Sequence, residues 1–395
     1  MKLEDEAEKY LMNTYARQAV AFVRGRGMRL WDTEDREYLD FLAGIAVVNL
    51  GHAHPGVARA IAEQASLLVH TSNLYQVPPQ LELAKKLAGL SFADRAFFCN
   101  SGTEANEAAL KLARRWAHEN RGGAFEIIAC EGGFHGRTMF SLSVTGQSKF
   151  HQGFEPLVPG VKLMPYDDLA AARGLVDDKT AAIIVEPIQG EGGVRLPGPG
   201  YLSGLRELCD REGVLLIFDE VQTGMGRTGR LFAYEHEGVE PDIMTLAKAL
   251  GNGFPIGAVL ATERAAAGFA PGAHGATFGG NFLAAQAALA VLREFEDGKL
   301  LAHVREIGDY FKDRLRNLAQ THDLVLDVRG RGLLLGMELD RPGATAVKHC
   351  FEKGFLVNCT AERILRFAPP LIVQKPEIEA LLPVLDSALA ELARA

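Results

Sequence analysis

An acid and an amine stand at the ends of two short apolar segments near the middle of this 395-residue chain. Residues 214–218 stop at Asp219, and residues 243–247 stop at Lys248. Short runs of β-branched and aromatic residues are typical of strands buried on both faces, and open α/β sheets bind ligands beyond the carboxyl ends of such strands. A lysine for a Schiff base and a carboxylate for a pyridine nitrogen are the groups that pyridoxal phosphate needs. The two residues are also typical of a helix cap and a solvated strand end.

The composition is that of an ordinary soluble globular protein, with 48% hydrophobic and 23% charged residues. A net charge of −8 argues against nucleic acid and anionic membranes as partners. No apolar run approaches the roughly 20 residues that span a bilayer, and residues 1–9 are too charged for a cationic apolar leader. The cysteines form no C-x-x-C pair, which predicts a reducing cytoplasm and neither a zinc site nor a disulfide framework. They are Cys99, Cys130, Cys209, Cys350 and Cys359.

Helical and strand-like segments alternate through the centre of the chain. This alternation predicts an α/β fold with right-handed crossovers and a mostly parallel sheet covered by helices on both faces. The expected strands are 96–99, 126–130, 181–185, 214–218 and 243–246, and the clearest helices are 105–119 and 201–212.

Both ends of the chain carry an α+β pattern instead. The turn signal at 33–36 predicts a hairpin near the start, and a long helical pattern begins after residue 281. We therefore expect a large cofactor-binding domain over 51–285 and a small domain built from 1–50 and 286–395. The expected elements of the ends are a helix and arm over 1–20, strands at 28–32 and 37–41, helices at 57–69 and 282–321, strands at 325–329 and 333–339, a further helix and strand, and a closing helix from Glu377.

A glycine-containing turn at Gly102 and Thr103 lies between a predicted strand and a predicted helix. A glycine there lets the backbone approach a phosphate, and a helix N-terminus supplies amide donors and a positive dipole end. The same stretch, Ser101 to Glu104, is also typical of an ordinary capping box.

Two further loops carry groups suited to a ring and to carboxylates. Phe134 offers a flat face for a pyridine ring, and Arg137 offers a planar fork for a carboxylate, although a turn with a core Phe and a surface Arg fits too. Glu191 follows Glu186 in a glycine-rich loop, and Arg366 lies inside an apolar segment. A buried arginine needs an anion. We hypothesise that Glu191 pairs with Arg366 when no dicarboxylate is bound; two independent structural charges are the alternative.

One segment favours a rival function, that of a nicotinamide-dependent dehydrogenase. Residues 224–229 match the pattern G-x-G-x-x-G. A dinucleotide-binding turn should follow its strand directly and open a helix, whereas Asp-Glu-Val-Gln-Thr intervenes here and no helical pattern follows Gly229. His52 and His54 have a spacing that could suit a metal, but no third ligand type lies nearby, so no metal site is expected.

Taken in order, these motifs resemble the class III aminotransferases of fold type I, which use pyridoxal phosphate, and the resemblance runs almost end to end. Segments 12–17, 41–46, 49–55 and 134–137 are most similar to the acetylornithine aminotransferases within that class. The resemblance implies transfer of the terminal amino group of N2-acetyl-L-ornithine to 2-oxoglutarate in arginine biosynthesis. The products would be N-acetyl-L-glutamate 5-semialdehyde and L-glutamate. It also implies a cytoplasmic homodimer with the active site at the subunit interface.

The resemblance assigns roles to individual residues. Lys248 would bind the cofactor and move the proton, and Asp219 would pair with the pyridine nitrogen. The other implied cofactor contacts are Gly102 and Thr103 at the phosphate, Phe134 on the ring, Gln222 at the phenolic oxygen, Glu220 and Val221, and Thr277 at the phosphate of the neighbouring subunit. The implied substrate contacts are Arg137 at the α-carboxylate, Arg366 at the carboxylate of glutamate or 2-oxoglutarate, Glu191 as its switch, and Ala276 through backbone or packing alone.

One departure bears on the amino donor. Ornithine aminotransferases resemble this chain but carry a tyrosine where Ile45 stands, and that tyrosine helps to hold a free α-amino group. Isoleucine fits an acylated α-nitrogen better, because a buried ammonium without a partner is penalised. Ornithine, succinylornithine, 4-aminobutyrate and a carrier-linked lysine precursor are the alternative donors. A binding protein of the same fold is a further alternative, against which the intact Asp219, Gln222 and Lys248 argue.

Overall fold

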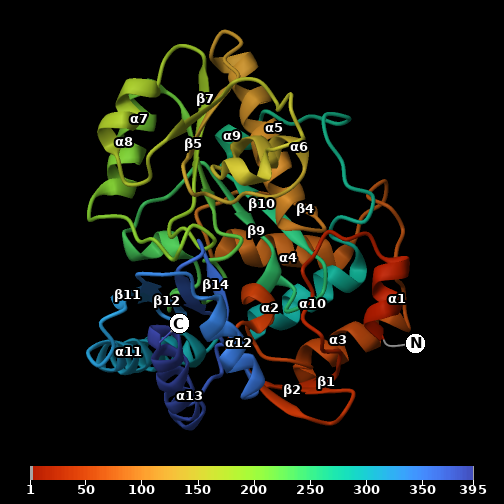
Figure 1. Cartoon of the computed structure of the whole chain (residues 1–395). Helices are drawn as coiled ribbons and strands as arrows, with labels where there is room; N and C mark the ends of the chain where they lie inside the picture. The colour runs from red at the N-terminus through yellow and green to blue at the C-terminus, as the bar shows by residue number, and fades with distance from the viewer. Residues whose placement is uncertain (1–2, 395) are drawn as a thin grey trace.

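The structure is a computed structural model that describes residues 3–394, with side chains from residue 6 onward; residues 1 and 2 of the predicted N-terminal helix lie outside this range. A seven-stranded sheet forms the centre (Figure 1). Every strand predicted for the centre is present. Strands β6 and β10 were not predicted, and β10 runs antiparallel to both its neighbours. In spatial order the strands are β4 (Arg95–Cys99), β10 (Gly257–Ala261), β9 (Ile243–Leu246), β8 (Leu215–Asp219), β7 (Thr180–Val185), β5 (Glu126–Cys130) and β6 (Val161–Met164).

Helices cover both faces of this sheet, as expected. All residues of β7 and β8 are buried, and alternate residues along them pack into two different apolar clusters, as the period of two in a strand requires. One cluster contains α5, and the other contains α8 and α10. The helices of this part are α3 (Pro55–Ala65), α4 (Pro78–Gly89), α5 (Gly102–Asn120), α6 (Met139–Val144), α7 (Leu169–Leu175), α8 (Tyr201–Glu212), α9 (Glu263–Ala266) and α10 (Phe282–Arg293).

Two smaller sheets lie beside the central one, and the first joins the two ends of the chain. Strand β13 pairs in parallel with β3, so a C-terminal segment completes the N-terminal sheet; red and blue elements lie together in Figure 1. We therefore propose the division into a large domain over 51–285 and a small domain from both ends. The strands are β1 (Phe22–Arg26), β2 (Arg29–Asp32), β3 (Glu37–Asp40) and β13 (Phe355–Leu356) in one sheet, and β11 (Val325–Arg331), β12 (Leu334–Leu339), β15 (Ile364–Phe367) and β14 (Asn358–Thr360) in the other.

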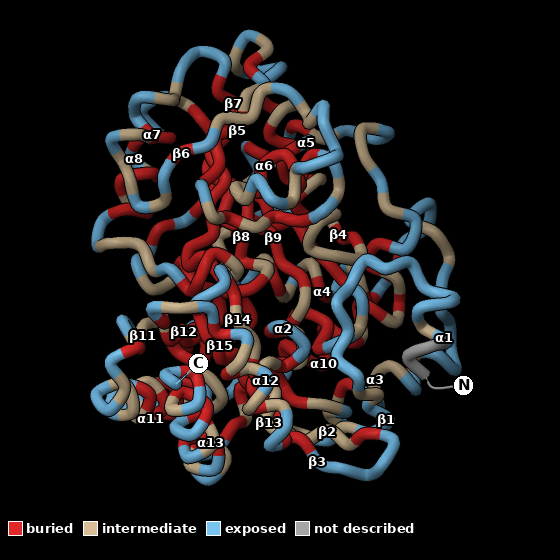
Figure 2. The backbone as a smooth tube through the Cα atoms, viewed as in Figure 1, coloured by how far each residue is buried: buried red, intermediate tan, exposed pale blue. Residues whose placement is uncertain are grey.

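Helices α11 (Lys299–Ala319), α12 (Ala344–Glu352) and α13 (Lys375–Arg394) pack with the two small sheets, and α1 (Leu3–Tyr10) lies at the surface. The buried positions concentrate along the central strands, whereas the segment around α1 is exposed (Figure 2). None of the described helices combines the length and apolar composition that a membrane-spanning helix requires.

Two predicted helices end well before their expected last residue, whereas α5 starts three residues before the expected 105–119. The long helix expected over 282–321 is divided into α10 and α11, because Gly298 adopts a φ of 68° and starts a new helix. The helix expected over 57–69 is α3, which begins at Pro55, a residue suited to a first helical position, and ends at Ala65. The apolar side chains of 67–69 prolonged the helical pattern, but they lie exposed beyond the helix.

The short element α2 (Ala43–Ala46) is a left-handed turn. Its φ values are 52° at Ala43, 63° at Gly44, 66° at Ile45 and 58° at Ala46. For residues other than glycine this conformation costs about 1–2 kcal/mol each, because Cβ approaches the following carbonyl oxygen. Such strain persists only where the surroundings hold it, and it is concentrated at functional sites.

Candidate active site

A cavity of about 380 Å³ lies beyond the carboxyl ends of β8 and β9. Asp219, the last residue of β8, and Lys248, which follows β9, both line it. The structure thus brings together the two residues around which the site was predicted. The other predicted site residues in its wall are Gly102, Thr103, Phe134, Arg137, Glu191, Val221 and Gln222.

Lys248 combines a strained backbone with a buried amine. Its φ of 47° is left-handed, a conformation that aims the side chain away from the course of the strand and is uncommon for lysine. Burial lowers the pKa of Lys248, while the nearby carboxylate of Glu191 acts in the opposite direction without reversing the shift. A lowered pKa leaves more of the amine unprotonated and able to act as a nucleophile near neutral pH.

Asp219 is held in its ionised form by three donors. Burial opposes ionisation, but the contact with His135 and the hydrogen bonds outweigh it, so the pKa of Asp219 lies below its usual value. One carboxylate oxygen lies 2.8 Å from Nδ1 of His135 and accepts from the Asn106 amide at 2.7 Å. The other accepts the N–H of Val221 at 3.0 Å. A buried carboxylate of this kind can keep a proton on a pyridine nitrogen.

The first turn of α5 forms the side of the cavity suited to a phosphate. Ser101 accepts the N–H of Glu104 at 3.3 Å, which is one half of the predicted capping box; the Glu104 carboxylate accepts the N–H of Asn100 at 2.9 Å in place of that of Ser101. Ser101 also lines the cavity. A Cβ added to Gly102 would meet Val221 at 2.8 Å, so a larger residue would displace one wall of the cavity. Helix N-termini bind anions through their unpaired N–H groups and the helix dipole.

Phe134 and Arg137 lie in one loop on the opposite wall. The guanidinium of Arg137 is 4.1 Å from the centre of the Phe150 ring and 5.7 Å from that of Phe134. Arg137 is exposed, and its backbone N–H donates to the Thr103 hydroxyl at 3.1 Å. Stacking on an aromatic ring restrains the guanidinium and leaves its N–H groups available to a carboxylate.

Arg366, on β15, is 1% exposed and forms an ion pair with Glu191. Its Nη1 also donates to Gln222 at 3.2 Å, and its Nε donates to Asn358 at 3.2 Å. Burial raises the pKa of Glu191, but Arg366 and Lys248 outweigh this and the net shift is downward. Within residues 3–394, the buried Nη2 of Arg366 has no hydrogen-bond partner. A guanidinium whose Nη1 and Nε donate hydrogen bonds and whose Nη2 is open is suited to a carboxylate that replaces Glu191.

Four predicted contacts lie outside the lining of this cavity: Arg366, which lies behind Glu191, and Glu220, Ala276 and Thr277. Glu220 turns the other way, and its carboxylate accepts the N–H groups of Ala233 at 2.6 Å and Tyr234 at 2.8 Å. Burial raises the pKa of Glu220 to about 7. Its side chain therefore supports the neighbouring turn, while its backbone joins Asp219 to Val221. Ala276 and Thr277 lie in a surface loop, and Thr277 is exposed.

Several lining residues were missed or left without a role by the sequence analysis. Asn106 and His135 both contact Asp219, and Val47 comes from the left-handed turn region. Glu186 accepts the N–H of Phe134 at 2.9 Å and of Gly190 at 3.0 Å, and burial raises its pKa to about 7. The sequence signal that could have indicated Asn106 and His135 was their proximity to predicted site residues, since Asn106 follows Thr103 by one helical turn and His135 follows Phe134 directly.

The dinucleotide-like segment 224–229 serves packing. Arg227 is fully buried, and its guanidinium donates to the carbonyl of Leu333 at 3.0 Å, to the carbonyl of Pro369 at 2.5 Å and to the Asn49 side chain. No α-helix follows Gly229; a 3-10 turn at Ala233–His236 comes next. The segment is absent from the cavity wall, so the structure gives a dehydrogenase reading no support.

The donor set of the cavity fits pyridoxal phosphate. One wall offers an amine of lowered pKa, a second offers an ionised carboxylate, a third offers a helix N-terminus, and an aromatic ring stands between them. Lys248 would hold the aldehyde and Asp219 the pyridine nitrogen. Gly102 and Thr103 would hold the phosphate, and Phe134 would hold the ring. These are the four parts of the cofactor that a protein must bind.

Comparisons with known proteins agree with this geometry. The family model for class-III aminotransferases matches residues 11–389. The acetylornithine aminotransferase of Methanocaldococcus jannaschii is 51% identical over 391 residues, which cover 98% of each chain. The ornithine aminotransferase of Toxoplasma gondii, whose structure has partial occupancy of PLP at its active site, superposes with a TM-score of 0.95 at 37% identity over 99% of this chain and 94% of that chain. The acetylornithine aminotransferase of Elizabethkingia anophelis superposes with a TM-score of 0.87 at 36% identity over 98% of both chains. Sequence, fold and cavity therefore agree that the chain belongs to the class-III aminotransferases.

Proposed function

We propose that this enzyme transfers the terminal amino group of N2-acetyl-L-ornithine to 2-oxoglutarate in arginine biosynthesis, giving N-acetyl-L-glutamate 5-semialdehyde and L-glutamate. The observation that carries the proposal is the position of two arginines: Arg137 lines the cavity and is exposed, whereas Arg366 is buried behind Glu191, which lines the same cavity. The names of its relatives, which include acetylornithine aminotransferases about half identical to it, support the same substrates.

The chain's own residues divide the work of amino transfer. When bound, pyridoxal phosphate supplies an aldehyde that exchanges with amines and a ring that withdraws electrons. Lys248 would hold the cofactor, and its amine, once free, would act as general base and acid at the substrate carbon. Asp219 would keep the pyridine nitrogen protonated, because its own pKa is lowered by its contacts. Phe134 would restrain the ring, and the first turn of α5 would bind the phosphate.

The two half-reactions present carboxylates in different places. The first substrate reacts at a carbon that carries no carboxylate, and the second reacts beside one. Arg137 would bind the α-carboxylate of N2-acetylornithine, with Ala276 contributing only packing. Arg366 would bind 2-oxoglutarate after Glu191 withdraws, and Glu191 would cover Arg366 during the first half-reaction.

Glu191→Gln tests this switch. The glutamine amide can still accept from Arg366, but it carries no charge and is displaced more easily, so the carboxylate of N2-acetylornithine competes for Arg366 in an unproductive orientation. We expect the ratio of the two single-turnover rates to change by about tenfold in favour of 2-oxoglutarate, the factor that 1.4 kcal/mol corresponds to. Glu379→Gln is the matched control, because Glu379 pairs with Arg314 away from the cavity. An unaltered ratio in Glu191→Gln would remove the switch.

Arg137→Ala tests the assignment of the two arginines. We expect KM for N2-acetylornithine to rise about tenfold or more, since a hydrogen bond to a charged group contributes about 1.5–3 kcal/mol. KM for 2-oxoglutarate should change much less. Arg137→Lys should recover part of the loss because it keeps the charge without the fork. A larger effect on 2-oxoglutarate would mean that the two arginines are exchanged.

The donor itself is tested by single-turnover spectra with a panel of terminal amines. The panel contains N2-acetylornithine, ornithine, succinylornithine, 4-aminobutyrate and a carrier-linked lysine precursor. Ile45 offers no polar group to a free α-ammonium, so N2-acetylornithine should react with the highest kcat/KM. A higher value for ornithine would overturn the proposed donor.

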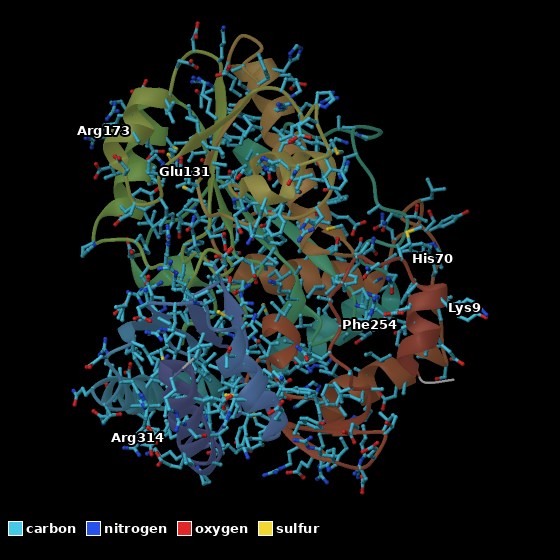
Figure 3. The ribbon with its side chains drawn as sticks, in the orientation of Figure 1. Lys9, His70, Glu131, Arg173, Phe254 and Arg314 are labelled. Carbon is cyan, nitrogen blue, oxygen red and sulfur yellow. The ribbon has the colours of Figure 1, made fainter. Side chains whose placement is uncertain are left out.

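We also propose a cytoplasmic homodimer with the active site at the subunit interface. Apolar side chains gather at one edge of the chain, where Leu74 is 87%, Tyr75 is 70% and Phe278 is 59% exposed. The His70 ring lies 5.5 Å from the Phe278 ring, and Figure 3 places His70 at the same edge as Lys9. Thr277 is exposed beside Phe278, as a residue that reaches a neighbour's phosphate would be. Light scattering should give twice the mass of 42.8 kDa.

The five free cysteines support the proposed cytoplasmic location, because a reducing compartment keeps thiols from forming disulfides.

A further inference from the structure

Residues 40–52 form a loop, the clasped loop, whose two ends meet through Asp40 and His52. Asp40 is 1% exposed. One of its carboxylate oxygens accepts the N–H groups of Leu42 and Ala43, both at 2.8 Å. Its other oxygen lies 2.7 Å from Nε2 of His52. A single buried carboxylate thus holds the first residues of the left-handed turn and also the far end of the loop.

The left-handed turn needs such external contacts. Its own hydrogen bonds are few: Ala46 N–H donates to the carbonyl of Leu42 at 2.9 Å, and the N–H groups of Val47 and Val48 both donate to the carbonyl of Ala43, at 2.8 and 3.0 Å. Ala43, Ile45 and Ala46 have positive φ values of 52°, 66° and 58°, which the side chains of L-residues disfavour. A strained turn of this length stays formed only because neighbouring groups fix it.

The turn borders the cavity from the side that carries the switch residue. Ala46 is buried in a small apolar cluster with Ile188 and Val194, the residues on either side of the segment that contains Glu191. The next residue, Val47, lines the cavity. Ile45 lies on the turn with 43% of its surface exposed. Displacement of the turn would therefore move Val47 and Ile45 together, and it would alter the wall against which the donor packs.

We propose that the Asp40–His52 pair is a clasp that holds the left-handed turn in place and thereby positions Val47 and Ile45 for the amino donor. Asp40 and His52 are positioning residues in this proposal, since neither lines the cavity. The inference rests on the proposed function and deepens it, because the Asp40–His52 contact outside the cavity would set the shape of the wall against which the amino donor packs. Arg366, which would bind the amino acceptor 2-oxoglutarate, is held by hydrogen bonds to Gln222 and Asn358 and does not depend on this pair.

His52→Leu tests the clasp, with His54→Leu as the matched control two residues away. The backbone of His52 exchanges hydrogen bonds with Gly27 at 2.9 and 3.0 Å, and the N–H of Leu50 donates to Asn252 at 2.8 Å. These contacts are independent of the imidazole, so the variant is expected to fold. In Asp40→Asn the side-chain oxygen can still accept both N–H groups and the amide can donate to His52. This conservative variant should therefore behave like the wild type.

Hydrogen exchange without substrate gives the first readout. In His52→Leu the amides of residues 46–48 should exchange about tenfold faster, whereas His54→Leu and Asp40→Asn should stay within about threefold of the wild type; a tenfold change corresponds to about 1.4 kcal/mol. Unchanged exchange in His52→Leu would overturn the clasp. The same acceleration in His54→Leu would also overturn it, because the effect would then belong to the loop as a whole.

Steady-state kinetics give the second readout. KM for the amino donor should rise about tenfold in His52→Leu, and KM for 2-oxoglutarate should stay within about threefold. Faster exchange with an unchanged donor KM would overturn the positioning role. The exchange readout needs no substrate, so failure of N2-acetylornithine as a donor leaves it intact. In that case the KM comparison uses the terminal amine that the wild type does accept, which separates failure of the clasp from failure of the proposed function.

Discussion

Lys248→Ala should abolish both covalent retention of the cofactor and measurable amino transfer. General acid–base catalysis contributes about 10²–10⁴-fold, and the variant loses this proton transfer together with the amine that holds the cofactor. The rate of each half-reaction should therefore fall by at least that factor. Borohydride reduction of the wild type followed by peptide mapping should place the pyridoxyl mass on residue 248, and the variant should carry none.

Lys162→Ala is the control for removal of a lysine from the large domain. Lys162 is paired with Glu126 and Asp177 at the sheet edge and does not line the cavity, so the variant should keep the covalent label and the rate. If Lys248→Ala kept either one, or if the label were found on another lysine, Lys248 would lose its assigned role.

Asp219→Asn should reduce kcat by about 10²–10³-fold, the range measured when one preorganised electrostatic partner is removed from an active site. Asparagine can still accept from Val221 and contact His135, but its amide nitrogen cannot accept the N–H of Asn106, so one of the three donors to Asp219 is lost. Asparagine also carries no charge, and it cannot keep the pyridine nitrogen protonated. Rapid-quench measurement of both half-reactions should show the loss in each of them, because both depend on the same ring.

Asp242→Asn provides the matched comparison. Asp242 is also buried and ion-paired, but its partners are Arg206 and Arg264 and it lies outside the cavity. We expect this variant to lose stability and to keep its kcat. Equal losses of kcat in both variants would show that Asp219 acts through the fold and not on the cofactor.

The central fold was predictable because strands buried on both faces have nearly continuous apolar sequences. The runs at 126–130 and 243–246 have the same bounds in β5 and β9. Strands β6 and β10 were not predicted. The small residues of β10, Gly-Ala-Val-Leu-Ala, carry little strand signal, and β6 is a four-residue segment, Val-Lys-Leu-Met, that contains a lysine. The break between α10 and α11 was missed because apolar periodicity continues across it, and a single glycine decides the backbone there.

The charged residues of the site were predictable for a related reason. An acid or a base next to an apolar run needs a partner, which indicated Asp219, Lys248 and Arg366. The contacts of Asp219 with Asn106 and His135 join segments far apart in the chain, and neutral polar residues give no comparable signal. The left-handed turn gave even less signal in the sequence, because its only glycine is Gly44 and its other residues are ordinary apolar ones.

The cavity wall includes the ends of β8 and β9 and the first turn of α5, elements that are also central parts of the hydrophobic core. A ligand that binds this wall only when the core is folded stabilises the whole protein by mass action, by about 2.7 kcal/mol at a hundredfold excess over Kd. The supply of pyridoxal phosphate is therefore expected to govern the lifetime of the folded enzyme at elevated temperature as well as its turnover.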